Sequence, residues 1–303
     1  MRTKNKIGYL LVKVLSLLTS IVLTVQVYAQ KVNQPMDVKV KISLDKTNYY
    51  VLEPIWLHMK IINNTKEAIE VDWIMLRSSL RILSDKEKEV PQYFHISTLP
   101  PRAPGIEPGD SMSTVFNIVD YYGTEGYGLI SWRLIHPGYY KIYSRLPQLS
   151  IMSNEIAINV FEPKDGESKA LSLLLEGMKL SEILGSERKT AKAKAYDKFE
   201  ELVQNYPHSI YAPKALIKAA GCYLYDQSEK GKARRKYKYR ELIDKYPKSL
   251  YVPEAFGGIL GIYSKGKDKD GAIKEMQALI KEYPNTDISK RAESAIKVIQ
   301  EKW

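Results

Sequence analysis

Cysteine is almost absent from this chain, since only Cys222 carries a thiol among 303 residues. A single thiol cannot form an intrachain disulfide, which excludes a small scaffold held together by disulfide bonds. The stretch AAGCYLY surrounds Cys222 with small and aromatic residues at helical spacing. This neighbourhood predicts a buried, inert thiol rather than a reactive nucleophile.

Histidine is scarce and the familiar catalytic motifs are missing. No two of the four histidines have the spacing of a metal-binding pair on a helix or hairpin: His58, His95, His136 and His208. The sequence contains no HExxH, GxSxG, Walker or GxGxxG motif. Asp120 and Glu125 flank a Tyr-Tyr-Gly stretch and could hold a cation or a sugar, or simply be solvated. We therefore predict a non-enzymatic protein without catalytic residues, metal or cofactor, and a site assembled from distant residues stays an alternative.

No apolar run is long enough to span a membrane. The longest, VLSLLTSIVLTV, has 12 residues, follows a basic start and precedes the small-residue stretch VYA that ends at Ala29, whereas a spanning helix needs about 20. This pattern predicts a cleavable secretory signal at 1–29, with a retained anchor as the alternative. Because no cysteine follows the cut, a lipoprotein is not expected. The mature protein is predicted to be exported, periplasmic or envelope-associated, and not transmembrane.

Positive charge is concentrated in the second half of the chain. Residues 30–163 hold 14 basic and 15 acidic residues, whereas residues 164–303 hold 28 and 20. Seven cations gather in one basic run, which Tyr237 and Tyr239 interrupt: Lys230, Lys232, Arg234, Arg235, Lys236, Lys238 and Arg240. The run could be a solvated helix face or bind an anionic surface, such as phospholipid, lipopolysaccharide or an acidic protein. Cations beside aromatic rings also suit nucleic acid, but the export signal argues against that partner, and we predict no nucleic-acid binding.

Residues 30–162 have the two-residue alternation of β-strands. Apolar residues alternate with polar ones in VKVKISL from Val38 and in IWLHMKI from Ile55. Further strands are expected at 68–74, 79–84, 112–118, 139–145 and 155–161. Short strands separated by turn signals predict an antiparallel sandwich. The phrases DKTNYYVLEPIWLHMKIINNT, HPGYYKIYSRL and SNEIAINVFEP resemble exported Ig-like and macroglobulin-type β-domains, which implies a module that binds proteins, glycans or peptides, or acts as a spacer.

After a predicted linker at 163–168, the period becomes helical over 169–303. The dipeptide Tyr-Pro recurs at 206–207, 246–247 and 283–284, at intervals of 40 and 37 residues, which suits two helices and their turns. Each helix should end at the Tyr because the following Pro disfavours helical geometry there. Ser209 and Ser249 can begin the next helix, with Pro213 and Pro253 in its first turn. Such hairpins bury their apolar faces by stacking, so we predict a multidomain β + α protein that ends in an α-helical solenoid.

The repeated positions resemble the tetratricopeptide repeat, in particular the exported variety with a Tyr-Pro turn found in periplasmic cell-division and outer-membrane-assembly proteins. The matching residues form three sets: Ala195, Phe199, Leu202 and Pro207; Arg235, Tyr239, Leu242 and Pro247; Ala272, Met276, Leu279 and Pro284. The middle set departs from the pattern, with Arg235 where the others have Ala. The resemblance implies a curved stack whose inner helices bind a partner.

Helical phase alone places six candidate partner-binding residues on the first helix of each hairpin, at 211–225 and 251–264: Tyr211, Lys214, Lys218, Tyr225, Tyr251 and Glu254. Tyr and basic side chains suit protein interfaces, although the tyrosines could instead pack between helices. We predict a non-enzymatic adaptor of the bacterial envelope that binds an envelope protein or peptide in this groove. The alternative makes the β-domain a protease-inhibitor-like or glycan-binding module, with the repeats mediating assembly.

Overall fold

The computed structural model describes residues 37–71, 79–86, 88–90, 105–120, 136–146 and 151–302. The predicted signal at 1–29, His95 and Glu125 lie outside these ranges. The chain divides into two compact units, an N-terminal β region and a largely helical unit. The helical unit also takes in two earlier segments, Lys46–Ile55 and the described part of Asn117–Tyr139.

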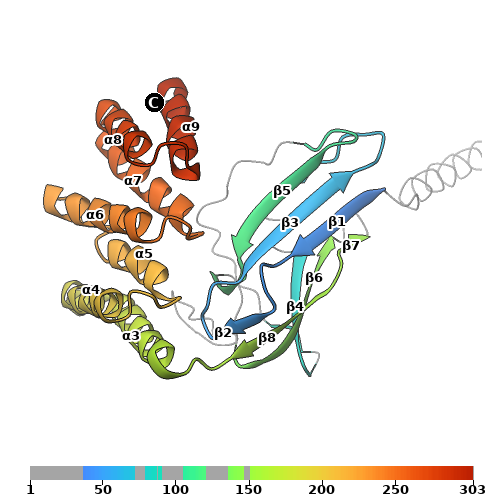
Figure 1. The fold of residues 1–303 in the computed structure, drawn as a ribbon, viewed down its shortest axis with the longest axis horizontal. Helices are drawn as coiled ribbons and strands as arrows, with labels where there is room; N and C mark the ends of the chain where they lie inside the picture. Colours follow the sequence, from blue (N-terminus) through green and yellow to red (C-terminus); the bar gives the residue numbers. More distant parts are fainter. Residues whose placement is uncertain are drawn as a thin grey trace, which may run out of the picture. The chain divides into compact units, whose positions relative to one another are not determined.

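The first sheet of the β region has the strand order β1-β3-β5 (Figure 1). It consists of β1 (Val38–Ser43), β3 (Trp56–Asn63) and β5 (Ser111–Asn117). The predicted alternation is confirmed along β1, whose valines and Ile42 are buried while Lys39, Lys41 and Ser43 are exposed. The buried side chains meet Met59 and Ile61 of β3, because β1 and β3 pair in antiparallel register.

The remaining strands of the β region pair around β6 (Gly138–Leu146). Both β4 (Leu80–Ser84) and β7 (Ile151–Met152) are antiparallel to β6. Their apolar residues Leu80, Ile82 and Ile142 are fully buried. Predicted strands at 79–84, 112–118 and 139–145 are therefore confirmed within about a residue, whereas 68–74 extends beyond the described residues and shows only an isolated bridge from Ile69 to Ile106.

A purely antiparallel arrangement is wrong for this protein. The short β2 (Asn48–Tyr50), which the sequence analysis missed, pairs in parallel with β8 (Ile156–Phe161). Parallel neighbours need a long crossover, and here Tyr49 lies beside Val160 although more than a hundred residues separate them. The chain therefore has mixed sheets, and a three-residue strand next to a turn leaves too little alternation to be detected in the sequence.

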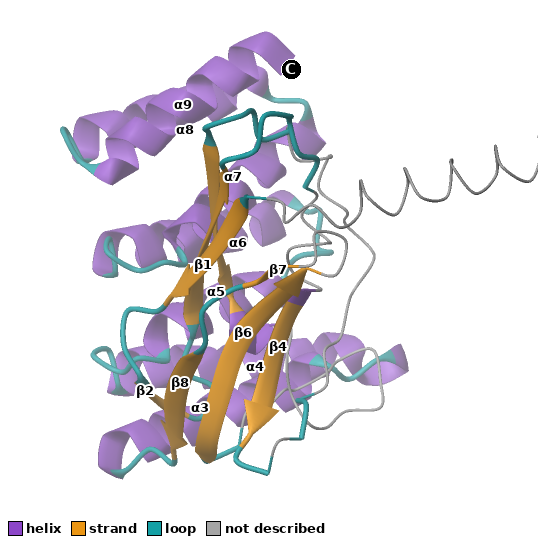
Figure 2. Cartoon of the chain, turned by 90° about the vertical axis from the view of Figure 1, so that its right-hand side faces the viewer, coloured by secondary structure: helices purple, strands orange, loops and turns teal. Residues whose placement is uncertain are grey.

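Helices follow β8 as successive antiparallel hairpins (Figure 2). They are α3 (Asp165–Ser181), α4 (Arg188–Asn205), α5 (Ala212–Cys222), α6 (Glu229–Lys245), α7 (Val252–Gly266), α8 (Lys269–Glu282) and α9 (Asp287–Lys302), with the single turn η3 (Gly185–Glu187) between α3 and α4. Another single turn, η1 (Ile118–Asp120), follows β5. The first helix begins within the predicted linker at 163–168. None of the helices in the described ranges is both long and apolar enough to cross a membrane.

The Tyr-Pro turns end the second helix of each hairpin as predicted. Tyr206, Tyr246 and Tyr283 adopt nearly the same backbone, with φ of −133°, −132° and −124° and ψ of 56°, 55° and 57°. The following Pro moves these residues out of the helical region. Each Tyr N–H still donates to the carbonyl four residues earlier, at Leu202, Leu242 or Leu279. The three-copy motif therefore encodes one stop geometry.

The tyrosines of these turns also join successive repeats. The hydroxyl of Tyr246 donates to the carbonyl of Pro207, one repeat earlier, at 2.7 Å. The hydroxyl of Tyr283 donates to the carboxylate of Asp244. Burial and this hydrogen bond raise the pKa of Tyr283 to about 12. The motif thus sets the spacing between neighbouring hairpins as well as the end of each helix.

The middle repeat keeps its packing despite the departure from the pattern. Ala195 and Ala272 are fully buried at the small position, and Arg235 is 3% exposed at the same place. Its neighbour Tyr239 is larger than Phe199 or Met276, and Gly258 of α7 provides the room. A Cβ at Gly258 would lie 2.3 Å from the Tyr239 ring, so this glycine is required by close approach of the helices.

Candidate functional site

The sequence-predicted tyrosines Tyr211 and Tyr251 lie inside the helical unit rather than in an open groove. Their exposed fractions are 0% and 4%. Each begins a helix, and its backbone N–H donates to the hydroxyl of the preceding Ser209 or Ser249, at 3.1 and 3.2 Å. Helical phase predicted accessible side chains at these two positions, but both are buried.

Both tyrosines hold a segment of the chain that precedes the helices. The hydroxyl of Tyr211 donates to the carbonyl of Val51 at 2.6 Å. The Tyr251 hydroxyl accepts from the side-chain amide of Asn117 at 3.5 Å, and Oδ1 of Asn117 accepts from the N–H of Ile55 at 3.0 Å. Burial, reinforced by nearby carboxylates such as Glu167, raises the pKa of Tyr211. These side chains therefore organise residues 46–55 and 117–119 of their own unit.

The other four predicted residues are dispersed. Lys214 is buried, with an exposed fraction of 3%, and Lys218 is half-buried. Glu254 is exposed on α7. Tyr225 is 70% exposed, and its ring lies under two cations of α4, Arg188 at 4.7 Å and Lys192 at 5.0 Å. The six predicted residues therefore do not form one surface.

A groove does exist between first helices of neighbouring hairpins, one hairpin further along the chain. It lies between α7 and α9 and has a volume of about 710 Å³. Phe256 and Leu260 of α7 and Val298 of α9 form its apolar part, and Lys290 and Arg291 of α9 add positive charge. The Nζ atom of Lys290 lies 3.7 Å from Oδ1 of Asp287 and forms an ion pair with it. Arg291 has no ion-pair partner in the described part of the chain.

The sequence analysis missed the residues that α9 contributes to this groove. A signal was present, because Ile288, Ala292 and Ile299 recur at helical spacing and are buried. They anchor the helix on one face, which leaves Arg291 and Val298 on another. The helix was overlooked as a binding element because no fourth Tyr-Pro turn follows it.

The predicted basic surface on α6 needs correction at two of its seven positions. Arg235 and Lys238 are buried, with exposed fractions of 3% and 2%, because they lie on the side of α6 that faces its neighbouring helices. Lys232 pairs with Glu229 at 2.8 Å and Lys236 with Glu275 at 3.0 Å. Arg240 pairs with the same Glu275 and with Glu282, both on α8.

The remaining cations of the basic run are Arg234 and Lys230. Arg234 donates to the Tyr223 hydroxyl at 2.9 Å. Lys230 is exposed, and no hydrogen bond or ion pair involves it within the described ranges. Most of the charge in this run is therefore used within the helical unit.

Lys238 forms the most buried ion cluster that the structure describes in the helices. Its ammonium donates to Glu200 of α4 at 2.7 Å and to Glu241 of α6 at 2.6 Å. Desolvation lowers the pKa of Lys238, but the hydrogen bonds with the two carboxylates outweigh it, and the pKa lies above its ordinary value. Burial likewise opposes ionisation of Glu241, yet its bonds with Lys238 and Lys245 lower its pKa. The cluster therefore links two hairpins.

Few side chains in the described ranges could act as metal ligands or nucleophiles. Within them, no group of three or more His, Cys, Asp and Glu side chains could hold a metal ion. Cys222 is buried, as its neighbourhood predicted, and burial raises the pKa of its thiol to about 12. A thiol with this pKa is almost fully protonated at neutral pH and is a poor nucleophile.

Comparison with known proteins identifies one repeat. Residues 261–286 match the tetratricopeptide repeat family model. This segment contains the end of α7, all of α8 and the third Tyr-Pro turn. A tetratricopeptide repeat indicates interaction with another protein. No curated protein matches the chain.

Solved structures show only distant likeness. They include a mutant β-glucosidase from Listeria innocua in complex with laminaribiose, with 12% identity over 41% of this chain and 16% of that chain and a TM-score of 0.26. The yjhA protein from Bacillus subtilis has 9% identity over 42% and 94%, with a TM-score of 0.24. The sporulation control protein Spo0M from the same organism has 14% identity over 47% and 54%, with a TM-score of 0.23. At these TM-scores they support no conclusion about this chain.

Proposed function

We propose that the protein is a non-enzymatic adaptor of the bacterial cell envelope, which binds a segment of a partner protein in the groove between α7 and α9. The tetratricopeptide repeat supports a protein partner. The groove supports the location, because it is lined by the first helices of consecutive hairpins and combines apolar side chains with Arg291, which has no ion-pair partner within the described ranges. The apolar run and basic start of residues 1–29 support export.

The composition of the groove defines the partner segment. Phe256, Leu260 and Val298 offer an apolar strip, and Val298 is 47% exposed in the absence of a partner. Arg291 lies beside this strip. A short segment with apolar side chains and a nearby carboxylate would bury the strip and pair with Arg291.

Site-specific crosslinking tests this proposal in cells. We would replace Val298 with a photoreactive benzoylphenylalanine and express the full chain in a bacterial host that carries its natural envelope partners. A discrete crosslinked protein is expected at this position, and its yield should fall at least tenfold in the R291E background. The matched control places the same group at Tyr237, which is 64% exposed on α6. Adducts from Tyr237 but none from Val298 would refute groove binding.

A further inference from the structure

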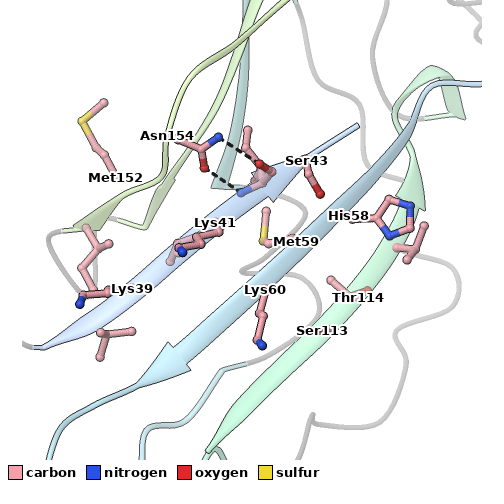
Figure 3. Close-up of a pocket in the computed structure, with 15 residues that line it drawn as sticks. Lys39, Lys41, Ser43, His58, Met59, Lys60, Ser113, Thr114, Met152 and Asn154 are labelled. Atoms are coloured by element: carbon pink, nitrogen blue, oxygen red, sulfur yellow. Dashed lines mark hydrogen bonds between the residues drawn. The ribbon is translucent and has the colours of Figure 1, made fainter. Parts of the chain in front are cut away.

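The β region contains a trough that is independent of the helical groove. It has a volume of about 720 Å³ and is lined by β1, β3, β5 and the residues Ile151, Met152 and Asn154 (Figure 3). Three lysines line it, Lys39 and Lys41 from β1 and Lys60 from β3. Each of them is exposed, and none has an ion-pair partner in the part of the chain that the structure describes.

The strand register brings the lysines together. Lys41 lies directly opposite Lys60 in the antiparallel pair, and Lys39 is two residues along β1, on the same face and about 7 Å away. Like charges directly opposite each other in a sheet are destabilising. We call Lys39, Lys41 and Lys60 the β1–β3 lysines. Binding of an anionic group among them would reduce the repulsion between their ammonium groups.

Protection of a sheet edge does not explain this arrangement fully. Lysines on an edge strand discourage pairing with other chains, and that role fits Lys39 and Lys41. It does not fit Lys60, because β3 is the central strand of the order β1-β3-β5. A positive charge there adds repulsion without protecting an edge.

The outer edge of β1, which pairs with no strand in the described ranges, borders the same trough, and β7 lies close to β1. Both backbone groups of Ile42 bond to the side-chain amide of Asn154, at 2.9 and 3.0 Å, as Figure 3 shows. Backbone groups alternate in direction along a strand, so Val40 and Val38 present theirs on the same side as Ile42. Within the described ranges no further strand pairs with this side of β1.

We propose that this trough binds an extended acidic peptide segment of a partner protein. Carboxylates at alternate positions of an extended chain are about 7 Å apart, which matches the spacing of Lys39 and Lys41. The third lysine, Lys60, reaches the same carboxylates from β3. The peptide backbone pairs with the edge of β1 beside Val38 and Val40, and Asn154 limits this pairing at Ile42. Met152, which is 61% exposed at the wall of the trough, provides an apolar contact.

The test uses the full chain and a fluorescent eight-residue peptide of alternating Glu and Val, followed by anisotropy. Saturable binding is expected, and the double variant K41E/K60E should weaken it at least tenfold. K66E is the matched control, because Lys66 is an exposed lysine of the same unit outside the trough, and it should change binding less than twofold. A peptide with Gln in place of Glu should not bind. Equal loss in K66E and K41E/K60E would overturn the proposal.

Two further arms separate strand pairing from general attraction to anions. Two peptides would be N-methylated at alternate residues, one at the odd and one at the even positions. Only one of these two sets of amides faces β1, so one peptide should lose binding and the other should bind within threefold of the unmethylated peptide. Unchanged binding of both methylated peptides, or equally tight binding of polyphosphate, would overturn the peptide assignment. The variant K41Q/K60Q guards against misfolding, because it removes repulsion and should retain or raise Tm while losing peptide binding.

Discussion

The basic run of α6 and the β1–β3 lysines are both clusters of positive charge, but they differ in how many ion pairs their members form. The run has seven cations in eleven residues, the densest charge in the sequence. Four of them form ion pairs within the helical unit, at positions 232, 236, 238 and 240. The three β1–β3 lysines, which the sequence does not emphasise, have no such pairs in the described ranges. Charge density along a sequence therefore does not predict free charge.

The difference follows from the two architectures. Stacked hairpins bring each helix against others at a fixed offset, so cations of α6 meet Glu200 of α4 and Glu275 of α8. In the sheet, register alone decides the neighbours, and Lys41 meets Lys60. The helical hairpins thus neutralise most of a basic helix internally, whereas this register leaves Lys41 and Lys60 to solvent or a ligand.

Loss of the buried lysine should have the largest effect. K238M keeps the aliphatic packing but leaves the carboxylates of Glu200 and Glu241 without their shared cation. We expect a loss of about 3 kcal/mol in the free energy of unfolding, as for one partner of a buried pair. Urea unfolding of K230M is the control, because Lys230 is exposed, and a change within about 0.5 kcal/mol is expected there. Similar losses in both variants would contradict internal pairing.

The same cluster should make stability depend on acid. The pKa of Glu241 is lowered from its ordinary 4.5, so its contribution is present above that pH and lost as pH falls through the folded value. The difference in Tm between the wild type and E241Q should be clear at pH 7 and shrink progressively below about pH 4.5. Glu229, whose side chain is 90% exposed, supplies the control E229Q, for which a small, nearly constant difference is expected.

Arg235 is the poorly paired member of the basic run. Among the described residues, its guanidinium donates only to the Leu224 carbonyl, at 3.4 Å, and two of its nitrogens are buried without a partner there. R235M should therefore raise the free energy of unfolding, by about 1 kcal/mol, because unpaired buried donors are costly. A destabilised R235M in chemical unfolding would show that the guanidinium makes a favourable contribution that this geometry does not reveal.

The smallest effect is expected on the sheet. Removing one charge of the Lys41–Lys60 pair, as in K60Q, should stabilise the protein by a few tenths of a kcal/mol at low salt. Salt screens repulsion between exposed charges, so the gain should disappear near 1 M NaCl. Thermal unfolding at both salt concentrations measures it. A gain that is unchanged by salt would mean that repulsion is not its cause.

Much of the fold could be predicted from local patterns. The strands of β1 and β3 follow from alternation, and the helix ends at Tyr206, Tyr246 and Tyr283 follow from the Pro after each. The sequence placed a groove on helices at 211–225 and 251–264, whereas the groove in the structure lies between α7 and α9. Tyr211 and Tyr251 could not be placed because their partners, Val51 and Asn117, lie more than a hundred residues away. The parallel pair of β2 and β8 was missed for the same reason.

The sequence by itself determined the two kinds of secondary structure, the helical hairpins and their stop signals, because periodicity and the steric effects of proline act over a few residues. Only the tertiary structure decided which cations are free. An ammonium group in α6 is neutralised by carboxylates from other helices, and a lysine of β1 meets another lysine across the ladder. Electrostatic pairing depends on distances of a few ångströms between distant parts of the chain, and those distances exist only after folding.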